Sequence, residues 1–267
     1  MKRRVTLALA ALIVVCVIVT AIPMLQAATA TPQDRTNKVL RNLKLEDAID
    51  LGEYTSPIQS VGECHAYTDE SGDMTLCFDL ETGRLVQLEN LAALEEGDRE
   101  PVFDSEEEKR ECALKWAEDT LADARFGELV LTNVGTYSYV FSEYYDGIPT
   151  GTSAMVSFME NGELLGVSLF YGDLFERDVF GRYSLRRGDD LIGEDAAVAA
   201  AEKALAEFAE AQGYTYTQKP TVELTVYRNQ LCYKVTIVTD RTSERARDFY
   251  IHVDAYDAAN LEIGYTK

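Results

Sequence analysis

The chain has 267 residues, of which 46% are hydrophobic, enough to bury the cores of one or two ordinary domains. It carries 46 acidic against 25 basic side chains, and because residues 1–30 hold three basic and no acidic ones, the remainder has a net charge of −24. Such a surface repels nucleic acid and anionic lipid headgroups, so nucleic acid is excluded as a partner. The acidity would favour a basic partner, but we interpret it as a means of keeping an exported protein soluble.

Residues 1–30 are predicted to be a signal peptide or a membrane anchor. Lys2, Arg3 and Arg4 precede an uncharged run whose apolar part is long enough to cross ~30 Å of hydrocarbon. This part is longer than the ~7–15 residues of a typical signal-peptide core, although Ala28-Thr29-Ala30 fits a cleavage site. We prefer an uncleaved transmembrane helix. Both interpretations place the rest of the chain outside the cell membrane, tethered to it or secreted, because the basic residues stay on the cytoplasmic side.

Residues 31–100 are predicted to contain a tether followed by a β-hairpin region. The first part is polar, and its one candidate helix, around Asn37–Asp50, has loosely spaced apolar residues. Residues 63–80 then alternate as a hairpin that turns at Asp69–Gly72. A second turn, Glu81-Thr82-Gly83, leads into a further strand.

Four cysteines lie beyond the N-terminal segment, too few for a disulfide scaffold at this length. If the hairpin is centred at positions 70–71, Cys64 and Cys77 lie directly opposite one another, and directly opposed strand residues can come close enough for a bridge. We therefore predict a disulfide between these two residues. Cys112 and Cys232 are expected to be free and mostly buried.

Residues 101–172 are predicted to form a unit of one helix followed by an antiparallel sheet. The S-x-x-E sequence Ser105–Glu108 fits a capping box, in which side chains satisfy unpaired N–H groups at a helix start. Asp146-Gly147 and Asn161-Gly162 are the strongest hairpin signals in the chain, because both central residues of a type I′ turn need positive φ. Residues 173–192 are mixed in charge and are interpreted as a linker.

Residues 193–267 are predicted to repeat the same plan. Gly193 takes the capping position of an alanine-rich helix that is expected to reach Gln212, with Leu205 and Phe208 on its buried stripe. Three runs of alternating apolar and polar residues follow, as expected for a sheet with one buried face.

This last stretch resembles the PepSY domain, a small extracytoplasmic α+β module. The resemblance rests on Glu194 and Asp195, which open the helix, and on the strand FYIHVDA at 249–255. FDLETGRLVQL, at 78–88, resembles the end of PepSY-type units, and residues 144–167 resemble YcdB/YcdC-type repeats of exported Gram-positive proteins. The sequence departs from the family at its glycine cap and in its closing turn. The resemblance implies an α+β fold of tandem PepSY, cystatin-like units, each with one helix on an antiparallel sheet, after an N-terminal transmembrane helix.

No pattern in the chain predicts catalysis. His65 and His252 are interpreted as surface residues of strands, and no nucleophile motif or metalloprotease motif is present. Two histidines and no C-x-x-C pair provide almost no zinc ligands. Asp69, Ser71 and Asp73 resemble the start of a calcium loop that lacks its glycine and glutamate, so we interpret them as a polar hairpin tip. We predict no catalytic residue, no metal and no cofactor.

The resemblance implies a non-catalytic binding module that regulates or inhibits an envelope peptidase or a cell-wall hydrolase. The expected contact surface is a sheet face or the tips at Asp146-Gly147, Asn161-Gly162 and the polar loop 240–248. The alternative is an envelope hydrolase that uses paired carboxylates, and a third interpretation is a structural or sensory ectodomain. Two converging carboxylates with raised pKa values in a cleft would favour the enzyme. A shallow polar sheet surface would favour binding.

Overall fold

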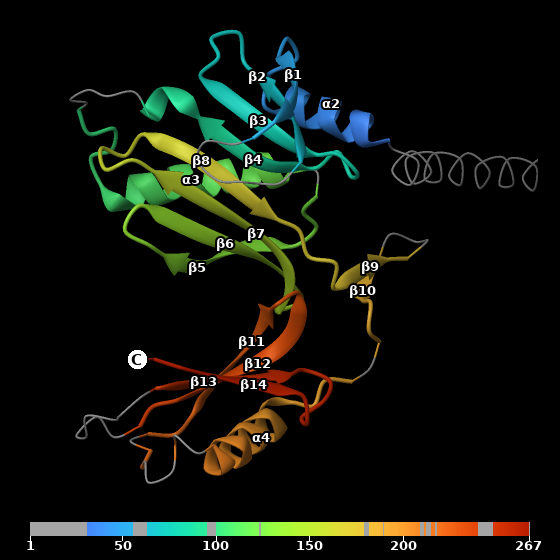
Figure 1. Ribbon diagram of the computed structural model, residues 1–267, viewed down its shortest axis with the longest axis vertical. Helices are drawn as coiled ribbons and strands as arrows, with labels where there is room; N and C mark the ends of the chain where they lie inside the picture. The colour runs from blue at the N-terminus through green and yellow to red at the C-terminus, as the bar shows by residue number, and fades with distance from the viewer. Residues whose placement is uncertain are drawn as a thin grey trace, which may run out of the picture.

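The structure is a computed structural model that describes residues 31–55, 63–94, 100–122, 124–178, 182–188, 190–208, 211, 215–216, 218–239 and 248–266. Its strands form antiparallel sheets of eight and four strands and one two-stranded ribbon. In Figure 1 the eight-stranded sheet lies above the four-stranded one, and α4 lies on the far side of the latter. The predicted anchor, residues 1–30, falls outside the described residues. Within the described ranges, no helix is long and apolar enough to cross a membrane.

The first half of the large sheet and its helix comprise α2 (Pro32–Asn42), β1 (Ile49–Tyr54), β2 (Cys64–Thr68), β3 (Met74–Asp79), β4 (Leu85–Asn90) and the short 3₁₀ helix η1 (Leu91–Leu94). The second half comprises α3 (Glu106–Leu121), β5 (Glu128–Val134), β6 (Ser138–Tyr145), β7 (Ile148–Phe158) and β8 (Leu164–Phe170). Both halves run as a helix followed by four antiparallel strands.

The fold class predicted from the sequence is wrong. Tandem units, each with one helix on its own sheet, were expected at 101–172 and 193–267. Instead, the two meanders β1–β4 and β5–β8 join edge to edge in a single sheet of order β1-β2-β3-β4-β8-β7-β6-β5. The described chain is therefore mainly antiparallel β-sheet, and residues 31–100 supply half of its largest sheet instead of a tether.

The two halves meet where β4 pairs antiparallel with β8, with Leu88 opposite Val167. Gly166 permits this approach, because a Cβ atom there would lie 2.6 Å from the carbonyl oxygen of Leu88. At one end of the pairing, the side chain of Asn90 donates a hydrogen bond to the Leu164 carbonyl at 2.9 Å. The contact joins strands that are far apart in the sequence, so no local pattern indicates it.

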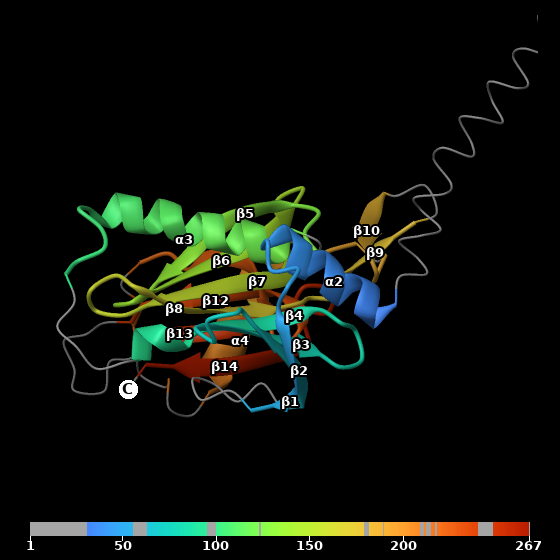
Figure 2. The same ribbon diagram turned by 90° about the horizontal axis from the view of Figure 1, so that it is seen from above.

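Helices α2 and α3 pack against the same face of the large sheet (Figure 2). Each helix starts at a side-chain cap, which satisfies N–H groups that have no partner within the helix. Thr31 and Asp34 form a full capping box on α2, and Ser105 accepts from the backbone of Glu108 on α3 at 3.2 Å. The core between the helices and the sheet contains Val39, Leu40, Leu76, Phe78, Leu88, Ala113, Ala117, Leu121, Phe141, Val156 and Val167.

The small sheet and its helix comprise α4 (Glu194–Glu207), β11 (Thr221–Tyr227), β12 (Gln230–Ile237), β13 (Phe249–Asp254) and β14 (Leu261–Tyr265). The strand order follows the chain, β11-β12-β13-β14. Gly193 is the cap of α4, as expected, and has a φ of +82°, but the helix ends at Glu207 and does not reach Gln212. Leu205 is fully buried against the sheet, whereas Phe208 is only partly buried at its edge.

The predicted linker contains a two-stranded ribbon, β9 (Phe175–Arg177) with β10 (Tyr183–Leu185). Aromatic rings attach this ribbon to the large sheet. Phe126 stacks on Tyr183 with ring centroids 3.9 Å apart, and Tyr145 meets Phe175 edge to face at 5.7 Å. The ribbon therefore fixes the path by which the chain leaves the large sheet for the small one.

The two hairpin signals differ in outcome. Asp146 and Gly147 have φ values of +50° and +77°, as a type I′ turn requires. At Asn161-Gly162 only the glycine has a positive φ, +90°, so this turn is not type I′. A further tight hairpin joins β11 to β12 through Arg228 and Asn229, both at positive φ, where the sequence gives no glycine signal.

Leu205→Ala is expected to lower the free energy of unfolding by about 2–5 kcal/mol, because a fully buried leucine leaves a cavity when truncated. Urea titration monitored by circular dichroism measures the change. Leu80→Ala is the matched control: Leu80 is 45% exposed, so the loss should stay within about 0.5 kcal/mol. Equal losses in the two variants would contradict the assigned core.

Candidate functional site

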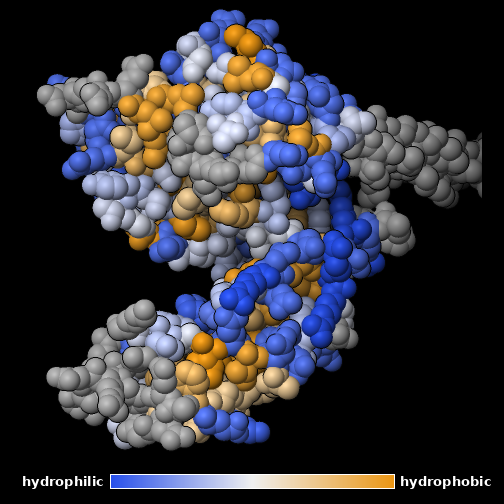
Figure 3. Space-filling model, in the orientation of Figure 1, coloured by the Kyte–Doolittle hydropathy of each residue, from blue (hydrophilic) through white to orange (hydrophobic). Residues whose placement is uncertain are grey.

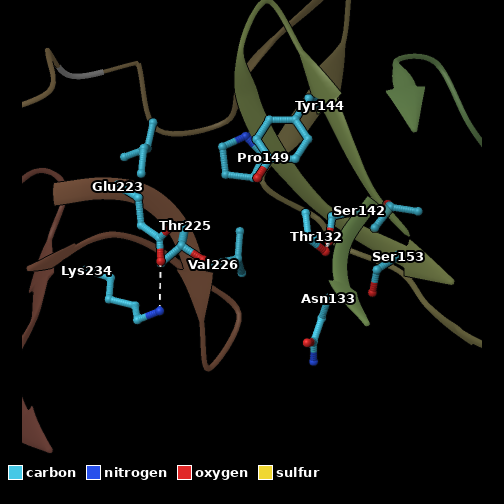
Figure 4. Close-up of a pocket in the computed structure, with 13 residues that line it drawn as sticks. Thr132, Asn133, Ser142, Tyr144, Pro149, Ser153, Glu223, Thr225, Val226 and Lys234 are labelled. Atoms are coloured by element: carbon cyan, nitrogen blue, oxygen red, sulfur yellow. Dashed lines mark hydrogen bonds and ion pairs between the residues drawn. The ribbon is translucent and has the colours of Figure 1, made fainter. Parts of the chain in front are cut away.

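The candidate site is a cleft of about 680 Å³ between the two sheets. Figure 3 shows the molecule hollowed between its upper and lower parts, and Figure 4 shows the side chains that face each other there. The large sheet contributes Thr132, Asn133, Ser142, Tyr144, Pro149, Gly151, Thr152 and Ser153. The small sheet contributes Glu223, Leu224, Thr225, Val226 and Lys234.

The wall from the large sheet is its face without helices. Ala154 and Val156 point into the core beneath α3, so strand alternation turns Ser153 to the opposite face. Ser142 pairs with Ser153 across β6 and β7 and continues the same row. At β5 the register shifts between Leu131 and Asn133, so Thr132 is an extra residue, and its hydroxyl hydrogen-bonds that of Ser142 at 2.9 Å. This wall is thus a surface of hydroxyl groups.

The wall from the small sheet is the edge strand β11. The strand order ends at β11, so among the described residues no further strand pairs with its outer side. The hairpin between β11 and β12 has a two-residue turn, so its closing pair, Tyr227 and Gln230, is hydrogen-bonded. Hydrogen-bonded and non-hydrogen-bonded pairs alternate along an antiparallel ladder. The N–H and C=O groups of Val222, Leu224 and Val226 therefore point away from β12. The side chains of these three residues pack toward the core of the small sheet, so it is their backbone groups that face the cleft.

A second edge borders the cleft, since β5 ends the order of the large sheet. Val130 and Val134 of β5 are 41% and 55% exposed. The start of this strand is fixed by Glu143, whose side chain is fully buried and whose Oε1 accepts from the backbone N–H groups of Phe126 and Gly127 at 2.6 and 2.7 Å. Its Oε2 accepts from the Thr150 hydroxyl at 2.7 Å.

A row of titratable side chains crosses the small sheet on the face away from α4. Glu223, Lys234, His252 and Glu262 are successive cross-strand neighbours on β11, β12, β13 and β14. Lys234 donates to Glu223 at 2.8 Å, the ion pair that is dashed in Figure 4. Burial, and then the nearby Glu223 carboxylate, raise the pKa of Tyr144 on the facing wall. Tyr144 therefore stays a neutral hydrogen-bond donor in the cleft.

His252 lies in this row and points away from the core, as the sequence predicts. Its ring stacks on that of Tyr227 with centroids 4.0 Å apart. Burial and the positive charge of Lys234 lower its pKa, an effect that Glu262 opposes. His65, the other histidine, lies on β2 beside the edge strand β1, and its Nε2 is 2.6 Å from a carboxylate oxygen of Asp50. The structure does not bring the two histidines together.

A second cavity, of about 550 Å³, continues the cleft past Gly151 and Val226, which line both. Gly151 has a φ of +86°, and a Cβ there would lie 3.0 Å from the Cα atom of Gly172. Arg84 and the half-exposed Phe170 lie at this far end. The guanidinium of Arg84 lies over the ring of Tyr171, 5.0 Å from its centroid. The two cavities together form a groove across the helix-free face.

The predicted contact tips fall in different places. Asp146-Gly147 adjoins the cleft, because Tyr144 and Pro149 on either side of it line the wall. Asn161-Gly162 lies at the other end of β7 and packs against Phe103. Of the predicted loop 240–248, residues 240–247 fall outside the described part of the chain. The cleft itself was missed, because it depends on how the two sheets meet.

The predicted cysteine pair is close but not directly opposed. Cys64 pairs with Asp79 and Cys77 with Ala66, which places the two cysteines on a diagonal. The five-residue turn shifts the centre of the hairpin from where the sequence suggested, and both thiols are free. Cys232 is buried, which raises its pKa to about 11, and Cys112 is only half-buried.

No family model, curated protein or solved structure matches this chain. The PepSY resemblance therefore stays a prediction. Within the described ranges, no three histidine, cysteine or acidic side chains are grouped closely enough to hold a metal ion. Among the residues that line the cleft, the one carboxylate is Glu223, and it is paired with Lys234.

Glu143→Ala is expected to lower the free energy of unfolding by about 3 kcal/mol, because two backbone N–H groups and one hydroxyl lose their acceptor. Urea titration measures the loss. Glu128→Ala, at an exposed position of β5, is the control and should change little. A loss for Glu143→Ala no larger than the control's would mean that the carboxylate does not fix β5.

The lowered pKa of His252 predicts a pH dependence of stability. The folded state binds the His252 proton more weakly than the unfolded chain, in which the pKa of histidine is about 6.5. The free energy of unfolding should therefore fall as the pH drops from about 6.5 toward the lower folded pKa. His252→Gln should flatten this part of the profile, measured by urea titration between about pH 5 and pH 8. A profile unchanged by His252→Gln would contradict the assignment.

Proposed function

We propose that this protein is a non-catalytic binding module that holds an extended segment of a protein partner in the cleft and so regulates or inhibits that partner. The observation that carries the proposal is the free edge of β11, which offers unpaired backbone groups opposite a wall of hydroxyls. An extended peptide satisfies such an edge by adding a strand, and the alternating side chains of the peptide then meet the facing wall.

The length of the groove suits this ligand. It crosses the helix-free face from Thr132 on β5 to Phe170 on β8, four adjacent strands of the large sheet. Four strands spaced at about 4.8 Å span about 15 Å, which is roughly five residues of extended chain. The hydroxyls of Ser142, Ser153 and Thr225 suit peptide groups or small polar side chains, and Phe170 offers an aromatic contact at the far end.

The class of partner follows from the resemblance to PepSY and YcdB/YcdC-type modules. It implies an envelope peptidase or a cell-wall hydrolase, restrained by direct contact outside the cell membrane. The net charge of −24 beyond residue 30 favours a neutral or basic segment over an acidic one. Attachment to the membrane through residues 1–30 is part of the same proposal.

Ser153→Trp is expected to weaken binding of the partner at least about tenfold, because the indole fills the cleft where the added strand would lie. The purified protein is used to capture its partner from envelope extract, and the affinity and the rate of the captured peptidase or wall hydrolase are then measured. Ser157→Trp is the matched control, on the same strand and face but outside the cleft lining. The partner's rate should change with wild type and with the control, and much less with Ser153→Trp.

The enzyme alternative is tested in the same preparation. Wild-type protein is incubated with peptide and peptidoglycan substrates, beside Glu223→Gln and His252→Gln. Turnover that one of these substitutions abolishes would overturn the binding proposal, because loss of a catalytic acid or base typically costs ~10²–10⁴-fold in rate. No turnover, together with a captured hydrolase whose rate responds to the protein, is the expected result.

A further inference from the structure

A sealed pair of thiols lies on the helix-free face of the large sheet, outside the lining of the cleft. Cys64 on β2 and Cys77 on β3 are 1% and 0% exposed and form their own small apolar cluster with Ala66. Tyr54, at the end of β1, and Val86 pack against this cluster. The two cysteines are on neighbouring strands and on the same face, as their register with Asp79 and Ala66 requires.

The two cysteines lie in one buried cluster, on neighbouring strands and diagonal to each other in the ladder. The Cys64 thiol donates to the backbone carbonyl of Tyr54, with Sγ 3.2 Å from the oxygen. A disulfide would require the two sulfurs to approach to about 2.05 Å, across the β2–β3 pairing in which Cys64 lies opposite Asp79 and Cys77 opposite Ala66.

Tyr54 and Glu89 close the site. The Tyr54 hydroxyl donates to Oε2 of Glu89 at 2.9 Å, and the Glu89 side chain is fully buried. Within the described part of the chain, Oε1 of Glu89 has no hydrogen-bond partner. Burial raises the pKa of Glu89 and of both thiols, and Glu89 raises the thiol pKa values further. A thiol must ionise to attack a disulfide, so this pair is unreactive once Tyr54 is in place.

We propose that Cys64 and Cys77 form a disulfide while the chain folds. Tyr54 and Glu89 then cover the two sulfurs, so that thiol reagents in solution no longer reach them and the disulfide is retained in the native protein. The oxidant is a low-molecular-weight or protein disulfide, RSSR. One cysteine thiolate attacks RSSR and releases RSH, and the second then attacks the mixed disulfide and releases another RSH. Two thiols are oxidised to one disulfide, one RSSR is reduced to two RSH, and the two cysteine protons leave with the RSH.

The test starts from the full chain, unfolded and reduced and then refolded in a buffer of glutathione disulfide and glutathione. The product is denatured with an alkylating agent and no reductant, digested and analysed by mass spectrometry. We expect a linked pair of peptides containing Cys64 and Cys77, with Cys16, Cys112 and Cys232 alkylated. Cys112→Ser should leave the link intact, and Cys64→Ala should leave Cys77 alkylated. Alkylation of all five thiols in correctly refolded wild-type protein would overturn the proposal.

The seal is tested on the oxidised native protein by its rate of reduction with dithiothreitol. The native disulfide should be reduced at least tenfold more slowly than in the same protein in urea, and Tyr54→Ala should remove most of this protection. Tyr54→Phe, which keeps the ring but loses the hydrogen bond to Glu89, should have an intermediate rate. Equal rates for native and urea-unfolded wild-type protein would overturn the sealing role. Tyr67→Phe, on the helix-covered face, is the matched control and should leave the native rate unchanged.

Discussion

The pairing of β4 with β8 is the contact on which the rest of the structure depends. It turns two four-stranded meanders into one sheet and places α2 and α3 on one face, which leaves the other face without a helix. The contact needs backbone close to backbone, which Gly166 allows, and the Tyr171 hydroxyl secures it by donating to the Leu85 carbonyl at 2.5 Å. Both features with chemical interest, the cleft and the thiol pair, lie on the helix-free face that this pairing creates.

The cleft is built from parts that antiparallel sheets usually protect. An edge strand offers unpaired backbone groups, and natural sheets cover such edges or make them unsuitable for pairing. Here the edge strand β11 faces the helix-free face of the large sheet across the cleft. The hydroxyl wall adds hydrogen-bonding groups without charge, and the one ion pair of the lining, Glu223 with Lys234, is internally compensated.

The sequence predicted much of the local structure, because helix caps, tight turns and strand alternation depend on neighbouring residues. Ser105 caps α3, Gly193 caps α4, and Asp146-Gly147 takes a type I′ turn. Predictions that depended on the exact strand register were less accurate. Cys64 and Cys77 are diagonal because Cys64 lies opposite Asp79, two residues beyond Cys77, so the hairpin is centred at 71–72 instead of 70–71. The Arg228-Asn229 turn was not recognised, because non-glycine residues rarely take positive φ.

What the sequence by itself determined are the strongly acidic surface, the helices α3 and α4 and most of the β segments, since these follow from composition and from periods of 3.6 and 2 residues. The first helix was expected around Asn37–Asp50, but α2 spans Pro32–Asn42 and β1 begins at Ile49. What only the tertiary structure decided is which strand edges meet. Backbone pairing between strands that are distant in the chain, such as β4 with β8, leaves no periodic trace in either strand, because backbone groups are the same at every residue. The single large sheet, its helix-free face and the cleft against β11 all follow from that choice, and so the candidate site was visible only in three dimensions.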